Sequence, residues 1–174
     1  MNSVVVRESP ASQPDRVLRP TEAELGGCLL VASSGGHLLQ LHRISRQLDV
    51  KPRHWVTFDT PDSTCLLEGE NVTYAFHPTN RSGRNLLRNT LLAARLLKRL
   101  RPAAILTTGA GVAVPFCWLG RATGCRVIYV ESFTRIEALS LSGRLSLPTA
   151  HRFFVQWPEL AVKHSKAEFR GSVL

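Results

Sequence analysis

The chain alternates short apolar runs with longer segments in which apolar residues recur at helical spacing. The apolar runs are bounded by turn-forming residues and predict strands at Cys28–Ala32, His54–Phe58, Val72–Phe76, Ala103–Thr107, Arg126–Val130 and Arg152–Gln156. The helical spacing predicts helices at about Gly36–Leu48, Ser63–Glu68, Arg84–Leu100, Val112–Thr123, Ile136–Leu147 and Glu159–Ser165. Because the strands alternate with helices and stay largely apolar, the pattern predicts an α/β fold with a parallel sheet covered on both faces.

Length and composition predict one folded domain that follows a tail. At 174 residues the chain is long enough to form a single domain with its own core. Residues 1–25 are rich in charged residues and proline and contain no long apolar run, which predicts a disordered tail rather than a signal peptide. We expect the domain at 26–174, where the longest apolar run, Gly111–Gly120, is too short to span a bilayer.

The first predicted strand leads through a glycine turn, Ser34-Gly35-Gly36, into a helix whose first turn carries His37. A helix N-terminus has unpaired N–H groups and the positive end of the helix dipole, so it attracts anions. Open α/β sheets also bind their ligands at the carboxyl ends of the strands. The motif therefore indicates a site for an anionic small molecule. The alternative, a tight strand–helix connection with a solvated histidine, is equally compatible with these residues.

Two further segments are expected at the same edge of the sheet. Thr107-Thr-Gly109-Ala-Gly111 ends one strand, and its glycines indicate close backbone approach, either to a ligand or to a packed helix. Glu131 and Ser132 end the next strand, where a carboxylate would point into the ligand crevice. Alternatively, Glu131 pairs with Arg135 or caps the following helix. The histidine, the glycine turns and the carboxylate together predict a functional site.

The predicted helix Arg84–Leu100 carries Arg84, Arg88, Arg95 and Arg99 on one stripe, with leucine and alanine over much of its remaining surface. Packing against a sheet needs only part of that apolar surface. A second helix, a partner subunit or a membrane interface would cover the rest, unless this is simply a core helix with a solvated basic face. Arg81 and Arg84 flank the candidate cap Ser82, where cations are unfavourable unless an anion binds.

Charge and motif spacing narrow the class of ligand. The net charge of +9 favours an anionic partner such as a phosphorylated substrate or an anionic membrane. No nucleic-acid-binding signature is present. Asp59 follows the second predicted strand, where dinucleotide-binding domains carry an acidic residue, but the G-x-G-x-x-G spacing of those domains is missing. The cysteines form no C-x-x-C pair, so we expect reduced thiols and no zinc site. No Asp-x-Asp signature is present, and we expect neither a metal ion nor a cofactor.

The chain resembles asparagine-linked glycosylation protein 14 and its bacterial polysaccharide counterparts. The resemblance runs from about Leu25 to Leu174 and rests on motifs in the same order and at matching spacing. These motifs are Ser33-Ser-Gly-Gly-His37, Arg81-Ser-Gly-Arg84, Gly109-Ala-Gly111, Val127-Ile-Tyr-Val-Glu131-Ser-Phe-Thr-Arg135, Leu139-Ser-Leu-Ser-Gly143 and Phe154-Val-Gln-Trp157-Pro. The family implies a Rossmann-like, doubly wound sheet that forms the N-terminal, acceptor-side half of a GT-B glycosyltransferase. We expect half an enzyme, since the chain ends soon after its last predicted strand.

The resemblance also implies a reaction. A separate subunit resembling asparagine-linked glycosylation protein 13 would bind a nucleotide sugar, expected to be UDP-linked, and the acceptor would be a polyprenyl-diphosphate-linked saccharide. We predict inverting, metal-independent transfer with His37 or Glu131 as general base. The acceptor and its phosphates would contact Ser34, Gly35, Gly36, Arg81, Ser82, Arg84, Gly109, Gly111, Ser132 and Arg135. The alternative is a non-catalytic membrane adaptor that recruits the donor subunit.

Membrane attachment is expected to depart from the eukaryotic members of this family, which begin with a transmembrane anchor that residues 1–25 cannot form. This departure fits the bacterial branch, which makes exopolysaccharide or capsule. We therefore expect peripheral binding at the cytoplasmic face of the inner membrane, with Arg88, Arg95 and Arg99 in contact with anionic lipid.

Overall fold

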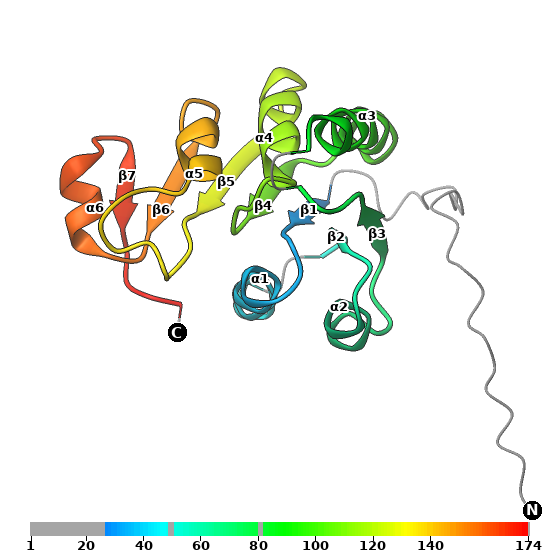
Figure 1. Ribbon diagram of the computed structural model, residues 1–174, viewed down its shortest axis with the longest axis horizontal. Coiled ribbons are helices and arrows are strands. Elements are labelled where there is room, and N and C mark those ends of the chain that lie inside the picture. Colours follow the sequence, from blue (N-terminus) through cyan, green and yellow to red (C-terminus); the bar gives the residue numbers. More distant parts are fainter. Residues whose placement is uncertain (1–26, 49–50, 80–81, 174) are drawn as a thin grey trace, which may run out of the picture.

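The computed structural model describes residues 27–48, 51–79 and 82–173, to which all structural statements refer. Within this part of the chain, seven parallel strands form one sheet in the order β3-β2-β1-β4-β5-β6-β7 (Figure 1). The strands are β1 (Cys28–Val31), β2 (Arg53–Phe58), β3 (Val72–Ala75), β4 (Ala104–Thr107), β5 (Arg126–Val130), β6 (Arg152–Val155) and β7 (Ala167–Phe169). The order reverses between β1 and β4, as in doubly wound Rossmann-like sheets, so the predicted fold class is confirmed.

Helices lie on both faces of the sheet (Figure 1). One face carries α1 (Gly36–Gln47) and α2 (Pro61–Leu66), and the other carries α3 (Gly83–Leu100) and α4 (Ala113–Ala122). The shorter helices α5 (Leu141–Ser146) and α6 (Pro158–Lys163) follow β5 and β6. The two layers give two apolar clusters, one beneath α1 and one beneath α3 and α4, and β1 is buried on both faces.

The structure differs from the prediction in two elements. Strand β7 was not predicted, because its three residues are too few for a periodic signal. The helix predicted at Ile136–Leu147 forms only as α5, because residues 132–139 are a loop held by side-chain hydrogen bonds described below. The predicted tail at residues 1–25 lies outside the described residues.

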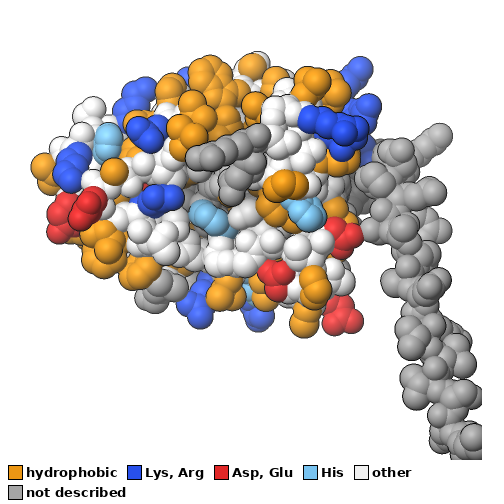
Figure 2. All heavy atoms as spheres, viewed as in Figure 1, with side chains coloured by type: hydrophobic (Ala, Val, Ile, Leu, Met, Phe, Trp, Pro, Cys, Tyr) orange, Lys and Arg blue, Asp and Glu red, His pale blue; other side chains and the backbone are white. Residues whose placement is uncertain are grey.

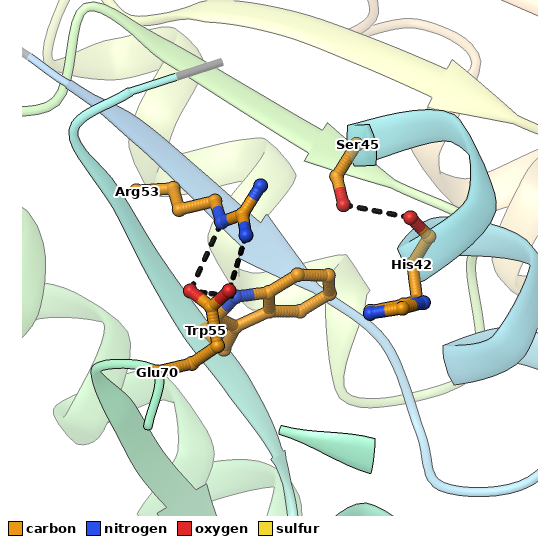
Figure 3. A network of polar contacts seen from close by, with 5 residues as sticks. All are labelled: His42, Ser45, Arg53, Trp55 and Glu70. Atoms are coloured by element: carbon orange, nitrogen blue, oxygen red, sulfur yellow. Dashed lines mark hydrogen bonds and ion pairs between the residues drawn. The ribbon is translucent and has the colours of Figure 1, made fainter. Parts of the chain in front are cut away.

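A polar network supports the side of the sheet opposite α3 (Figure 3). The Glu70 carboxylate accepts hydrogen bonds through Oε2 from Arg53 Nε at 2.9 Å and Trp55 Nε1 at 3.2 Å. Its other oxygen, Oε1, accepts from Arg53 Nη2. The imidazole of His42, from α1, lies 6.1 Å from the Trp55 ring. The Arg53 hydrogen bond is the main cause that holds the pKa of Glu70 below its usual 4.5.

Glu70→Gln should lower the free energy of unfolding near neutral pH by about 1–3 kcal/mol, because charged hydrogen bonds to Arg53 are lost. Since the folded-state pKa of Glu70 is lowered, this stabilisation is present above pH 4.5 and is lost as the pH falls through the folded-state value. Urea unfolding at several pH values measures both effects. Glu68→Gln, at an exposed position nearby, is the matched control, and equal effects of the two substitutions would contradict the prediction.

Candidate functional site

A cleft of about 990 Å³ opens at the carboxyl edge of the sheet. Its lining comes from the segments that follow β1, β3, β4 and β5, together with the start of α3 and the end of β2: Ser33, His37, Phe58, His77, Pro78, Thr79, Ser82, Gly83, Leu86, Ala110, Gly111, Val114, Ser132, Thr134, Arg135, Ser140, Leu141, Ser142 and Leu145. The volume is at the upper end for small-molecule sites. The cleft can therefore hold a ligand as large as a sugar joined to a diphosphate.

The His37 ring is held at this edge by Thr108, from the turn after β4. His37 Nδ1 lies 2.7 Å from the Thr108 carbonyl oxygen, and Thr108 Oγ1 donates to the His37 carbonyl oxygen at 2.7 Å. A carbonyl oxygen can only accept, so Nδ1 carries the proton of the neutral ring. The lone pair of the ring is then on Nε2, which is the form that a general base requires.

Glu131 has a different environment from the one predicted. Its side chain is fully buried, and its carboxylate accepts hydrogen bonds from Ser132 N at 2.9 Å, Ser140 N at 3.0 Å and Ser140 Oγ at 3.0 Å. A Cβ atom at Gly143 would lie only 2.1 Å from Glu131 Oε2, so the start of α5 is packed directly on the carboxylate. Glu131 thus ties together both ends of the loop that forms one wall of the cleft, and it does not itself line the cleft.

The predicted phosphate contact at Gly35 is also altered by the structure. The Gly35 amide already donates to Asp62 Oδ2 at 2.7 Å, from the first turn of α2. Hydrogen bonds from Thr60 and from this amide keep the pKa of Asp62 below its ordinary value, so a charged carboxylate occupies the turn. Ser34, Gly35 and Gly36 lie beside the cleft residues Ser33 and His37 but do not line the cleft.

Close packing against Tyr129 leaves no room for a side chain at Gly109. A Cβ atom there would lie 2.4 Å from the Tyr129 hydroxyl oxygen, and the residue adopts a φ of 99°. Burial, with a further contribution from the Glu131 carboxylate, raises the pKa of Tyr129. The phenol therefore keeps its proton, which it donates to Ser142 Oγ at 3.3 Å.

The remaining predicted site residues have three different outcomes. Ser82, Gly111, Ser132 and Arg135 line the cleft, whereas Gly109 and Arg84 do not, and Arg81 lies outside the described residues. Ser82 also caps α3 by accepting from Asn85 N at 3.3 Å, as predicted.

Several lining residues were not predicted, namely Ser33, His77, Thr79, Thr134, Ser140 and Ser142. Most of them follow a strand by a few residues. In a parallel sheet such residues lie at the carboxyl edge, so this position could have predicted that they line the cleft. Ser140 and Ser142 carry no such signal, because they reach the cleft only through the loop held by Glu131.

Helix α3 shows the excess apolar surface predicted for it. Leu86, Leu87 and Leu91 are exposed by 50%, 62% and 51%, although Leu86 also lines the cleft. Arg84, Arg88 and Arg95 are exposed, while Arg99 is half-buried with its Nε atom hidden. Hydrophobic side chains also gather over α4 and α5 (Figure 2), where Trp118, Leu141 and Leu145 are exposed. None of the described helices is long and apolar enough to cross a bilayer.

Glu131→Gln should lower the free energy of unfolding by about 1–3 kcal/mol, because one of the two carboxylate oxygens becomes an NH2 group that cannot accept from the backbone N–H it faces, either Ser132 N or Ser140 N. Amide hydrogen exchange of Ser132 and Ser140 should accelerate. Glu137→Gln, at an exposed position of the same loop, is the matched control and should change neither measurement. Unchanged stability and exchange in Glu131→Gln would show that the carboxylate does not hold the loop.

Comparisons with known proteins agree with this architecture. The family model described as "Oligosaccharide biosynthesis protein Alg14 like" matches residues 76–173. The UDP-N-acetylglucosamine transferase subunit ALG14 of Debaryomyces hansenii is 32% identical over 95% of this chain and 86% of its own length. The human subunit of the same name is 28% identical over 91% of this chain and 88% of its own length.

Solved structures support the fold. MurG of Acinetobacter baumannii superimposes with a TM-score of 0.67 at 18% identity, over 82% of this chain and 44% of its own. The UDP-GlcNAc 2-epimerase of Methanocaldococcus jannaschii gives a TM-score of 0.63 at 13% identity, over 83% of this chain and 45% of its own. The chain thus spans less than half of the length of each neighbour, and the predicted Rossmann-like, doubly wound fold is confirmed.

Proposed function

The chain belongs to the Alg14 family, and we propose that it is the acceptor-binding subunit of a two-component glycosyltransferase. A separate donor-binding subunit would supply a UDP-linked sugar, and this chain would hold a polyprenyl-diphosphate-linked saccharide. The relatives are named as subunits of a UDP-N-acetylglucosamine transferase, which supports an enzyme whose binding sites are shared between two chains. We place the reaction in bacterial exopolysaccharide or capsule synthesis, at the cytoplasmic face of the inner membrane.

The observation that carries the proposal is the His37 ring in the cleft, held with its Nδ1 against the Thr108 carbonyl. In the proposed step, an acceptor hydroxyl oxygen attacks the anomeric carbon of the donor sugar. The bond to the nucleoside diphosphate breaks with inversion, and His37 Nε2 takes the hydroxyl proton. Charged side chains of the two subunits, without a metal ion, would stabilise the phosphates. Glu131 would act by holding the cleft wall, rather than as the base.

We place the acceptor diphosphate between the start of α3 and the loop after β5. Ser82 lies at the N-terminus of an 18-residue helix, where a negative charge is favourable, and the cationic Arg135 also lines the cleft. Gly111 and Ser132 also line the cleft. Arg84 does not line it, and we assign it to the membrane-facing surface of α3 described below. The apolar rim residues Leu86, Leu141 and Leu145 would contact the first part of the lipid chain.

The test of this function is reconstitution. The chain alone should show no transfer from a UDP-sugar to a polyprenyl-diphosphate acceptor, and activity should appear when a donor-binding subunit is added. Robust turnover by the chain alone would contradict the proposal.

His37→Ala should lower the turnover of the reconstituted complex by about 10² or more, as expected for loss of a general base. Co-purification with the donor subunit should be unchanged. His42→Ala, on the same helix but packed against Trp55, is the matched control. Wild-type turnover in His37→Ala would favour the adaptor role, in which this chain only recruits the catalytic subunit to the membrane.

We infer that the exposed part of α3 lies against the membrane. Leu87 and Leu91 would enter the interface, and Arg84, Arg88 and Arg95 would contact anionic headgroups. Arg99 is left out of this surface because it is half-buried.

Replacing Arg84, Arg88 and Arg95 with glutamine should weaken binding to anionic liposomes by about 10², since each basic residue near such a surface contributes about 1 kcal/mol. High salt should reproduce the effect by screening. The same change at Arg43, Arg46 and Arg126, which are exposed elsewhere, controls for net charge. Equal loss in both triple variants would mean that binding follows total charge, and the role of α3 would be withdrawn.

A further inference from the structure

We propose that Thr108 is a positioning residue for His37, which it holds in one tautomer and in one place at the cleft. This inference rests on the proposed function, in which His37 takes the acceptor proton. Thr108 is fully buried and does not line the cleft, so it acts only through the histidine.

The contact is reciprocal and joins two separate segments of the chain. The Thr108 carbonyl oxygen faces His37 Nδ1, and the Thr108 hydroxyl donates to the His37 carbonyl oxygen, each at 2.7 Å. The residues are 71 positions apart, so the first turn of α1 is pinned to the turn after β4 by both the backbone and the side chain of one threonine.

The two hydrogen bonds have different consequences. The carbonyl selects the tautomer, because it can accept only from a protonated Nδ1 and so leaves the lone pair on Nε2. The hydroxyl sets the position, because it fixes the backbone of His37 relative to that carbonyl. Removal of the hydroxyl should therefore loosen the alignment of Nδ1–H with the carbonyl, although the carbonyl itself remains.

Thr108→Val removes the hydroxyl and keeps the shape of the side chain, whereas Thr108→Ser keeps the hydroxyl. Thr57→Val is the matched control, because Thr57 is also a fully buried threonine and its Oγ1 has no hydrogen-bond partner among the described residues. If Thr108→Val does not fold, Thr108→Ala removes the same donor.

In the complex reconstituted with a donor-binding subunit, Thr108→Val should lower kcat by about tenfold and leave KM nearly unchanged, since a small misplacement of a reacting group is costly. Thr108→Ser should restore most of the rate, and Thr57→Val should keep the parental rate. A purely structural role for Thr108 would not give a selective loss of kcat with rescue by serine.

A second readout needs no activity. ¹⁵N NMR of the imidazole of His37, recorded on the full chain at a pH where the ring is neutral, should show the Nδ1–H tautomer in the parent and in Thr108→Ser. Thr108→Val should shift the population toward the Nε2–H tautomer. A parent in the Nε2–H form, or a Thr108→Val variant with parental tautomer and parental kcat, would overturn the inference.

The two arms separate this inference from the proposed function. If the complex shows no transferase activity but the tautomer shifts in Thr108→Val and returns in Thr108→Ser, the proposed reaction fails while Thr108 still positions His37. If activity is present and neither arm responds to Thr108→Val, the proposed reaction stands and the positioning role falls.

Discussion

Every strand in the described sheet runs in the same direction, and the candidate site depends on this one constraint. Parallel pairing brings the carboxyl ends of β1, β3, β4 and β5 to one edge, so the segments that follow them must meet there. The cleft is lined by these segments together with the start of α3 and the end of β2. A histidine after one strand and a threonine after another become neighbours without any sequence proximity.

The meeting of these segments creates polar groups that burial would otherwise leave unpaired. A buried donor or acceptor without a partner is costly, so the loops are arranged around hydrogen bonds. Glu131 illustrates this, because its carboxylate pairs with Ser132 and Ser140 and thereby fixes the loop that supplies much of one wall. On the opposite side of β1, the exposed Asp62 carboxylate accepts from the exposed Gly35 amide and so joins the start of α2 to the turn after β1. Both carboxylates are engaged in these hydrogen bonds, and two histidines, His37 and His77, line the cleft. Of these, His37 has its Nδ1 atom held against the Thr108 carbonyl oxygen, which is the arrangement on which the proposed function rests.

The surface of α3 extends from the cleft across the outside of the protein. Helix α3 begins at the cleft with Ser82 and Leu86 and then carries Leu87, Leu91 and the arginines out over the protein surface. An apolar rim, an anion-attracting helix terminus and a basic stripe are therefore consecutive along one element. This order suits a ligand whose polar head lies in a cleft and whose apolar chain lies in a membrane, which is the chemistry of the proposed acceptor.

The sequence alone was sufficient for the strands β1 to β6, the alternation with helices and the edge at which a site would form, because each depends on local apolar runs, turn residues and the general behaviour of parallel sheets. It also indicated His37, Ser82, Gly111, Ser132 and Arg135, since each lies in or near a segment that follows a strand. Only the tertiary structure decided what their neighbours do. That Glu131 is buried in its own loop, that Asp62 occupies the Gly35 amide, and that Thr108 fixes the ring of His37 are results of contacts between distant segments. Residue type and spacing specify which groups reach the edge, but the pairing of those groups depends on three-dimensional distances that no local pattern encodes.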